Sequence, residues 1–204
     1  MALYVTVQEF KAKYKDVLGT ADDPFIADAI QGAQDQIDAH LNRVVLADAD
    51  TTEYFDSTGD EIDGRSLWLD MRGDLSSITT VTNGDGNTLT AVTEYETYPK
   101  TLGARRPTID RIVILGSVGK QWESPTDGDV ENAISIAGKW GMYNTVATVP
   151  EVFKLACMEL TAYNIEKRKS QIFETTAIPE AGVITTPAGI PINVLEKLRP
   201  WIRY

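Results

Sequence analysis

The sequence has 204 residues, and 43% of them are hydrophobic, which is enough for the core of one ordinary domain or of a domain with an insertion. The formal net charge is −11, and residues 1–150 carry it with 24 acidic against 12 basic side chains, which argues against tight nucleic-acid binding. No apolar run approaches the roughly 20 residues that span a bilayer, and a single cysteine excludes an internal disulfide. The start MALYVTVQEF has no basic segment before an apolar block, so we expect no signal peptide and synthesis in a reducing cytoplasm.

Two helices are predicted near the start of the chain. Thr6 and Glu9 have the spacing of a capping box, which satisfies the free backbone N–H groups at a helix start, and this first helix is expected to run to about Leu18. A second helix is expected from Pro24 to Asn42. Its apolar residues recur at spacings of three and four, at Phe25, Ile26, Ala29, Ile30, Ala33, Ile37 and Leu41.

Short strands are predicted in the middle of the chain, where β-branched and aromatic residues alternate with turn residues. The Asn83-Gly84-Asp85-Gly86-Asn87 stretch indicates a hairpin turn between two of them. We expect a small, mostly antiparallel β region. The strand candidates are Thr52–Phe55, Ser66–Met71, Ser77–Thr82, Arg111–Leu115 and Ala133–Ala137.

Helical periodicity returns at residues 149–169. Thr148 and Glu151 repeat the capping-box spacing at its start, and a wide apolar face follows. Prolines and glycines between residues 170 and 190 predict an irregular arm, and residues 191–198 predict one last short helix.

These elements predict an α+β fold. Its core would consist of antiparallel-packed helices, two N-terminal and one long C-terminal, from residues 1–45 and 148–169. A small antiparallel β region would be inserted at residues 46–147. Residues 170–204 would form an extended C-terminal arm that contains the short helix.

Residue types suited to catalysis are sparse in this sequence. The single histidine, His40, falls in the second predicted helix, and no histidine neighbours Cys157, which lies in an apolar helical face and is interpreted as a buried structural thiol. One cysteine and one histidine do not make a usual zinc site, and no glycine-rich phosphate-binding motif is present. We therefore expect no enzyme activity, no cofactor and no metal.

Two alternatives from other functional classes stay open at this point. The acidic segment DSTGDEIDG, with Asp60 and Asp63, offers paired carboxylates of the kind that a hydrolase uses. The spacing of Asn83, Asp85 and Asn87 with Glu94 partly matches a calcium loop, although Thr88 stands where glycine is expected.

The order of the elements adds a resemblance. An opening VTVQEFK helix is followed by DDPFIADAIQGAQDQIDAHLNR, then by the β segments TEYFD, LWLD and SITTV, and finally by KWG and VPEVFKLACMELTAY. This layout resembles the head–tail connector (adaptor) proteins of long-tailed bacteriophages and related gene transfer agents, over most of residues 4–168. A nearby alternative is another ring protein of the neck or tail, against which the two long amphipathic helices speak.

The resemblance implies a structural virion protein of the neck region. Copies of it would form a ring, commonly of twelve, below the portal protein. The ring would extend the DNA channel, through which DNA passes without specific binding, and would offer a docking platform to the next neck or tail-completion protein. No membrane is implied.

The resemblance also implies that the C-terminal arm reaches the portal. The arm ends in Trp201, Arg203 and Tyr204, which are residue types enriched at interface anchors. The expected portal-docking residues are Pro191, Leu195, Leu198, Arg199, Trp201, Ile202, Arg203 and Tyr204.

The long C-terminal helix supplies the candidate contacts between subunits. Glu159 and Glu166 of one protomer are expected to meet basic groups such as Lys154 or Lys167 of the next.

Overall fold

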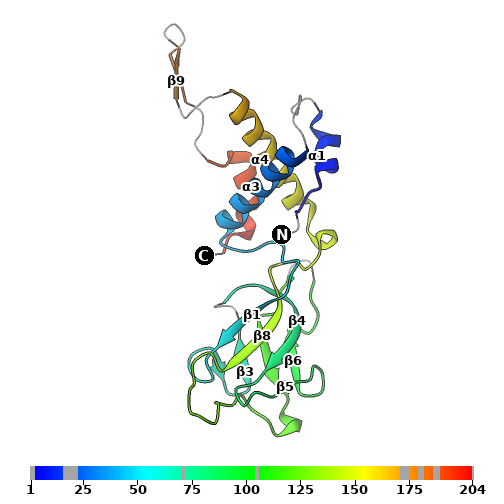
Figure 1. Cartoon of the computed structure of the whole chain (residues 1–204), viewed down its shortest axis with the longest axis vertical. Helices are drawn as coiled ribbons and strands as arrows, with labels where there is room; N and C mark the ends of the chain where they lie inside the picture. Colours follow the sequence, from blue (N-terminus) through cyan, green and yellow to red (C-terminus); the bar gives the residue numbers. More distant parts are fainter. Residues whose placement is uncertain are drawn as a thin grey trace. The chain divides into compact units, whose positions relative to one another are not determined.

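A computed structural model of the chain describes residues 3–15, 23–69, 72–103, 106–170, 175–178, 182–185 and 189–203. The chain divides into two compact units (Figure 1). The helical unit comprises Leu3–Asn42 and Val149–Tyr204, and the β unit comprises Arg43–Thr148, so the β unit interrupts the helical unit in sequence.

The helical unit contains α1 (Val7–Lys13), α3 (Asp23–Leu41), α4 (Glu151–Ser170) and α5 (Ile192–Leu198). Helix α3 packs against α1 and α4, and α4 also packs against α5. The 3-10 turn η3 (Arg199–Trp201) follows α5, and the short strands β9 (Thr175–Ile178) and β10 (Gly182–Thr185) pair as an antiparallel hairpin. The buried side chains of α3 are those predicted from its periodicity, except that Phe25 is half-buried and Gln34 is also buried.

One of the two predicted capping boxes forms. The hydroxyl of Thr6 accepts a hydrogen bond from the backbone N–H of Glu9 at 3.1 Å, and the Glu9 carboxylate accepts one from the N–H of Thr6 at 2.7 Å. The second prediction is wrong: Thr148 ends the 3-10 turn η2 (Val146–Thr148), and its hydroxyl donates to the carbonyl of Thr145 at 2.8 Å.

The first sheet of the β unit has the strand order β1-β8-β4-β5, with all neighbours antiparallel. Strands β4 and β5 form the hairpin predicted at Asn83–Asn87. Strand β4 has two register shifts where it pairs with β8, and Gly138 of β8 faces one of them. The strands are β1 (Thr51–Phe55), β4 (Leu75–Thr82), β5 (Thr88–Leu89) and β8 (Ile134–Trp140).

The second sheet has the order β2-β3-β7-β6 and is also antiparallel. It consists of β2 (Ile62–Asp63), β3 (Ser66–Trp68), β6 (Tyr95–Tyr98) and β7 (Arg111–Ile114), and the 3-10 turn η1 (Gly116–Val118) follows β7. Both sheets contribute to one hydrophobic cluster. Its members are Phe55, Leu67, Leu69, Leu75, Val81, Leu89, Tyr95, Ile109, Ile112, Ile114, Trp122, Ile134 and Ile136.

The predicted fold class is wrong about the size of the β region and about its dependence on the helical core. Within the described residues this region is not a small insertion on a helical core, because its two four-stranded sheets enclose a core of their own. The sheets pair strands that are distant in sequence, such as β1 with β8, so the size of the β body is not visible from single strands.

The predicted extended C-terminal arm is also wrong for residues 189–203. Val194 and Leu198 are fully buried, and the backbone N–H of Arg203 donates to the carbonyl of Leu41 at 3.1 Å. Apolar side chains one turn apart on α5 give this segment a face that is buried in the helical unit. Tyr204 lies outside the described residues.

Candidate functional site

The C-terminal segment is attached to α4 by polar and aromatic contacts. Lys197 of α5 forms an ion pair with Glu159 of α4, and the side-chain amide of Asn193 donates to the same carboxylate at 3.0 Å. Beyond α5, the ring of Trp201 packs on Phe153 with centroids 5.1 Å apart. These contacts fix which side of the segment faces outward.

The outward side of this segment carries an exposed apolar residue that was not among the predicted docking residues. Ile192 is 75% exposed at the start of α5, and Arg199 and Pro200 are exposed beyond its end. Of the predicted docking residues, Pro191, Leu195, Trp201, Ile202 and Arg203 are half-buried, and Leu198 is fully buried.

The predicted subunit-interface residues on α4 are not equivalent. Glu166 is exposed, and Lys154 and Lys167 are half-buried. Glu159 contacts α5 of its own chain, through Lys197 and Asn193. The position of Glu159 on the surface of the predicted helix suggested a contact with another protomer. The structure shows that α5 of the same chain already supplies a partner for Glu159.

Helix α3 holds the N-terminal segment through a polar cluster. The backbone N–H of Tyr4 donates to the side-chain oxygen of buried Gln34 at 2.9 Å, and the Tyr4 hydroxyl donates to Asp38. Burial, together with the charge of Asp38, raises the pKa of Tyr4 far above its ordinary value, so this hydroxyl stays protonated and remains a donor.

The residues most suited to covalent chemistry do not form a reactive site. Cys157 is fully buried, and its thiol contacts the carbonyl of Ile30 at 3.8 Å. Burial raises the pKa of Cys157 to about 12, so the reactive thiolate is absent at neutral pH. The prediction of a buried structural thiol is confirmed.

The calcium-like loop uses its own side chains to shape the turn. Asp85 accepts hydrogen bonds from the side chain and backbone of Asn87, at 2.6 and 2.9 Å, and the side-chain bond is the main reason for its lowered pKa. Glu94 pairs with Lys120 at 2.5 Å. Asn83 accepts from Gly84 and from Glu123, which ties the hairpin to the loop that precedes β8. Asn83, Asp85 and Asn87 thus stabilise the turn, and Glu94 forms an ion pair.

Two kinds of site are not found among the described residues. No group of three or more His, Cys, Asp or Glu side chains there is placed to hold a metal ion. No helix in the same residues has the length and apolar character needed to cross a membrane.

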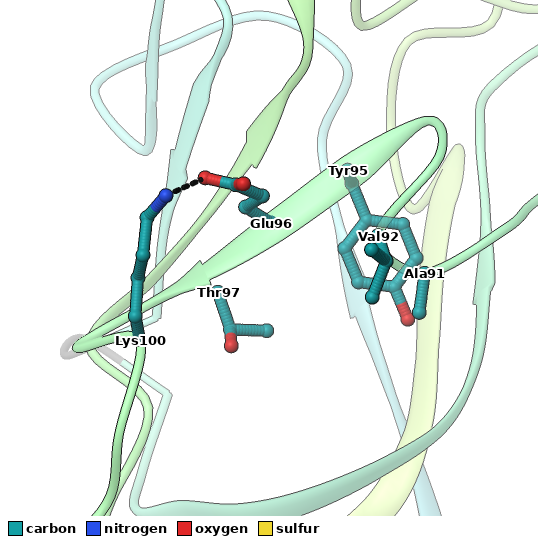
Figure 2. Close-up of a pocket in the computed structure, with 6 residues that line it drawn as sticks. All are labelled: Ala91, Val92, Tyr95, Glu96, Thr97 and Lys100. Carbon is teal, nitrogen blue, oxygen red and sulfur yellow. Dashed lines mark ion pairs between the residues drawn. The ribbon is translucent and has the colours of Figure 1, made fainter.

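Strand β6 forms one edge of the second sheet, and a hollow of about 220 Å³ lies beside it (Figure 2). Val92, which is 79% exposed, and Tyr95 line this hollow, and Lys100, which follows the end of the strand, points toward Glu96. The ammonium of Lys100 lies 2.6 Å from the carboxylate of Glu96, and its side chain remains 62% exposed. This edge therefore presents an apolar hollow next to an exposed cation.

The outer face of the same sheet carries an aromatic–arginine ladder, formed by Trp68, Arg111 and Tyr98. The three residues are directly opposite one another across β3, β7 and β6. The Arg111 guanidinium carbon lies 4.9 Å from the centroid of the Trp68 ring and 4.6 Å from that of Tyr98. In the part of the chain that the structure describes, no carboxylate pairs with Arg111, so the ladder adds positive charge to this side of the sheet.

Comparison with known proteins identifies the fold. No protein-family model matches the sequence, and no curated protein matches it. A chain from the neck of an empty gene transfer agent (GTA) particle, computed with C6 symmetry, matches 100% of this chain and 93% of its own length, with a TM-score of 0.61 and 16% identity.

Two further structures agree with the first. A chain from the neck of a native GTA particle, computed with C12 symmetry, gives a TM-score of 0.58 and 17% identity over 100% of this chain and 96% of its own. A chain from the virion of a native GTA particle gives a TM-score of 0.56 and 16% identity, over 100% of this chain and 93% of its own length. This chain has the fold of a GTA neck protein. The resemblance drawn from the sequence is thereby confirmed at the level of the fold.

Proposed function

We propose that this chain is a structural subunit of the neck of a virus-like particle, where it acts as a head–tail connector. The observation that carries the proposal is a neck-protein fold over the full length of the chain, with 93 to 96% of the matched chains covered. We propose a structural role without enzyme activity, which the shared neck-protein fold and the buried, protonated thiol of Cys157 support.

The proposed assembly is a ring of copies of this chain, and twelve is the proposed number. The C6 and C12 symmetry of the matched necks supports a ring. The net charge of −11 suits a ring through which DNA passes without specific binding, because like charges repel the phosphate backbone.

The proposed partners are a portal protein on one side of the ring and the next neck or tail-completion protein on the other. For the portal, we propose the outward side of the C-terminal segment, where Ile192 and Arg199 are exposed. Arginine is among the residue types enriched at protein interfaces, and an exposed isoleucine adds apolar surface that a partner can bury. The segment meets a partner as a folded helix and turn.

Contacts between subunits are proposed along α4, with Glu166 of one copy facing Lys154 or Lys167 of the next. Glu159 contributes differently, because it holds α5 in place through Lys197.

Deleting the gene from the producing phage or host and imaging the particles tests the function. The expected result is DNA-filled or leaking heads beside separate, finished tails, and a plasmid copy of the gene restores joined particles. Fully joined particles after deletion would remove the chain from the neck.

A further inference from the structure

The two edge strands of the second sheet, β2 and β6, lie at the same height along the strand direction. Reading across the strands, Asp63 of β2 is opposite Ser66 of β3, which is opposite Val113 of β7, which is opposite Glu96 of β6. Paired residues on neighbouring strands project to the same face of a sheet, so Asp63 and Glu96 share one face at opposite edges. A second copy displaced sideways in the plane of the sheet therefore brings its β2 level with β6 of the first.

The two edges carry opposite charge. Residues 56–65, which include β2, hold four carboxylates and one guanidinium. Strand β6 and the described residues that follow it, 99–103 and 106, hold one carboxylate, Glu96, and two basic side chains, Lys100 and Arg106. A chain of net charge −11 thus has a basic margin on one edge of a single sheet and an acidic margin on the other.

The exposed members of each edge are suited to contact. At the β2 edge, Asp60 and Asp63 are exposed, whereas Glu61 is already paired with Arg72 at 2.9 Å. At the β6 edge, Lys100 is bonded to Glu96, on the face that Asp63 shares. An ammonium group has three donors, so this bond leaves donors for a second carboxylate.

We propose that the β2 edge of one copy docks against the β6 edge of the next, with Asp63 and Asp60 facing Lys100 and the hollow beside Val92. Such a contact joins two different surfaces of the same protein, and it closes into a ring where each copy is also rotated by a fixed angle relative to the one before it. The proposal rests on the proposed ring and adds to it a second, charge-based contact through the β unit.

Charge reversal at the two edges tests the contact, using the full-length chain and sedimentation velocity up to about 1 mM, the concentration at which weak contacts are populated. The wild-type chain is expected to self-associate, and less so as salt rises, because exposed charges are screened. Lys100→Glu and Asp63→Lys are each expected to weaken association by roughly tenfold, since an attraction becomes a repulsion.

An equimolar mixture of the two single variants is the decisive sample. Where copies of the two variants alternate, the unchanged Asp63 of one faces the unchanged Lys100 of the other. At the next contact, the lysine introduced by Asp63→Lys faces the glutamate introduced by Lys100→Glu, so both kinds of contact join opposite charges. Association is therefore expected to recover in the mixture and in the double variant.

The matched controls for these variants are Lys13→Glu and Asp28→Lys. They make the same charge changes at exposed positions on α1 and α3 of the helical unit, so they alter the net charge of the chain without changing a residue of either edge. Neither control is expected to weaken association as the edge variants do.

The proposal would be overturned by a wild-type chain that stays monomeric over the whole range, by association unchanged in both single variants, or by a mixture that associates no better than either variant alone. An effect of Lys100→Glu without one of Asp63→Lys would also overturn it, since it would assign the β6 edge to a different partner. The gene-deletion experiment is independent of these results, because a connector that assembles only on its portal still leaves heads without tails when it is absent.

Discussion

The ring of Trp201, three residues before the end of the chain, packs on the ring of Phe153 in the first turns of α4, with centroids 5.1 Å apart and planes tilted by 59°. The contact joins the C-terminal turn to the body of the helical unit. It shows that the segment around Trp201 is part of a folded structure, which an extended arm would not be.

Trp201→Ala is expected to lower the free energy of unfolding by about 2 kcal/mol, less than for a fully buried tryptophan because Trp201 is half-buried. Urea denaturation measures the loss, and Arg199→Ala, at an exposed position, is the control with no expected change. Equal stability of the two variants would mean that the C-terminal turn adds nothing to the helical unit.

Gly138→Ala is expected to destabilise the β unit. A Cβ atom at this position would lie 2.2 Å from the carbonyl oxygen of Ser77 on β4, so strand β8 or β4 would have to shift, at a cost of about 1–3 kcal/mol. Gly32→Ala in α3 is the matched control, because nothing lies within 4 Å of its added Cβ and alanine favours a helix by about 1 kcal/mol. Thermal unfolding should therefore move in opposite directions for the two variants.

Asp74→Ala is expected to destabilise the β unit through the arginine that it leaves unpaired. Both carboxylate oxygens of Asp74 accept from the Arg43 guanidinium, at 2.6 and 2.7 Å, and the two side chains are only 8% and 18% exposed. Removing one partner of a mostly buried pair costs about 3 kcal/mol, and the double variant with Arg43→Met should recover part of it. Chemical denaturation of the single and double variants checks this; a double variant less stable than Asp74→Ala would contradict it.

The sequence predicted features that depend on neighbouring residues. The capping box at Thr6 and Glu9 and the extent of α3 are confirmed, since each depends on residues within a few positions of one another. The same pattern failed at Thr148, where a 3-10 turn takes the hydroxyl that a cap would use.

Features that depend on long-range register were missed. Nothing local pairs Phe55 with Ile134, or places Arg111 between Trp68 and Tyr98, so the two-sheet body and the charged edges were not visible. The partner of Glu159 was missed for the same reason, because Lys197 reaches it only once α5 has folded back.

Cys157 gives a prediction with a defined pH dependence. Burial raises the pKa of Cys157 in the folded chain to about 12, whereas the pKa of a cysteine thiol in an unfolded chain is about 8.5. The unfolded chain therefore loses this proton first as pH rises, and the contribution of the thiol to stability, complete below about pH 8.5, is lost progressively between the two pKa values.

A thiol-specific reagent at pH 8 should react with Cys157 of the native chain only as fast as the chain opens, so that added urea accelerates labelling in step with unfolding. Rapid labelling of the native chain, at the rate of a free thiol, would show that the site around Ile30 and Cys157 is open to solvent.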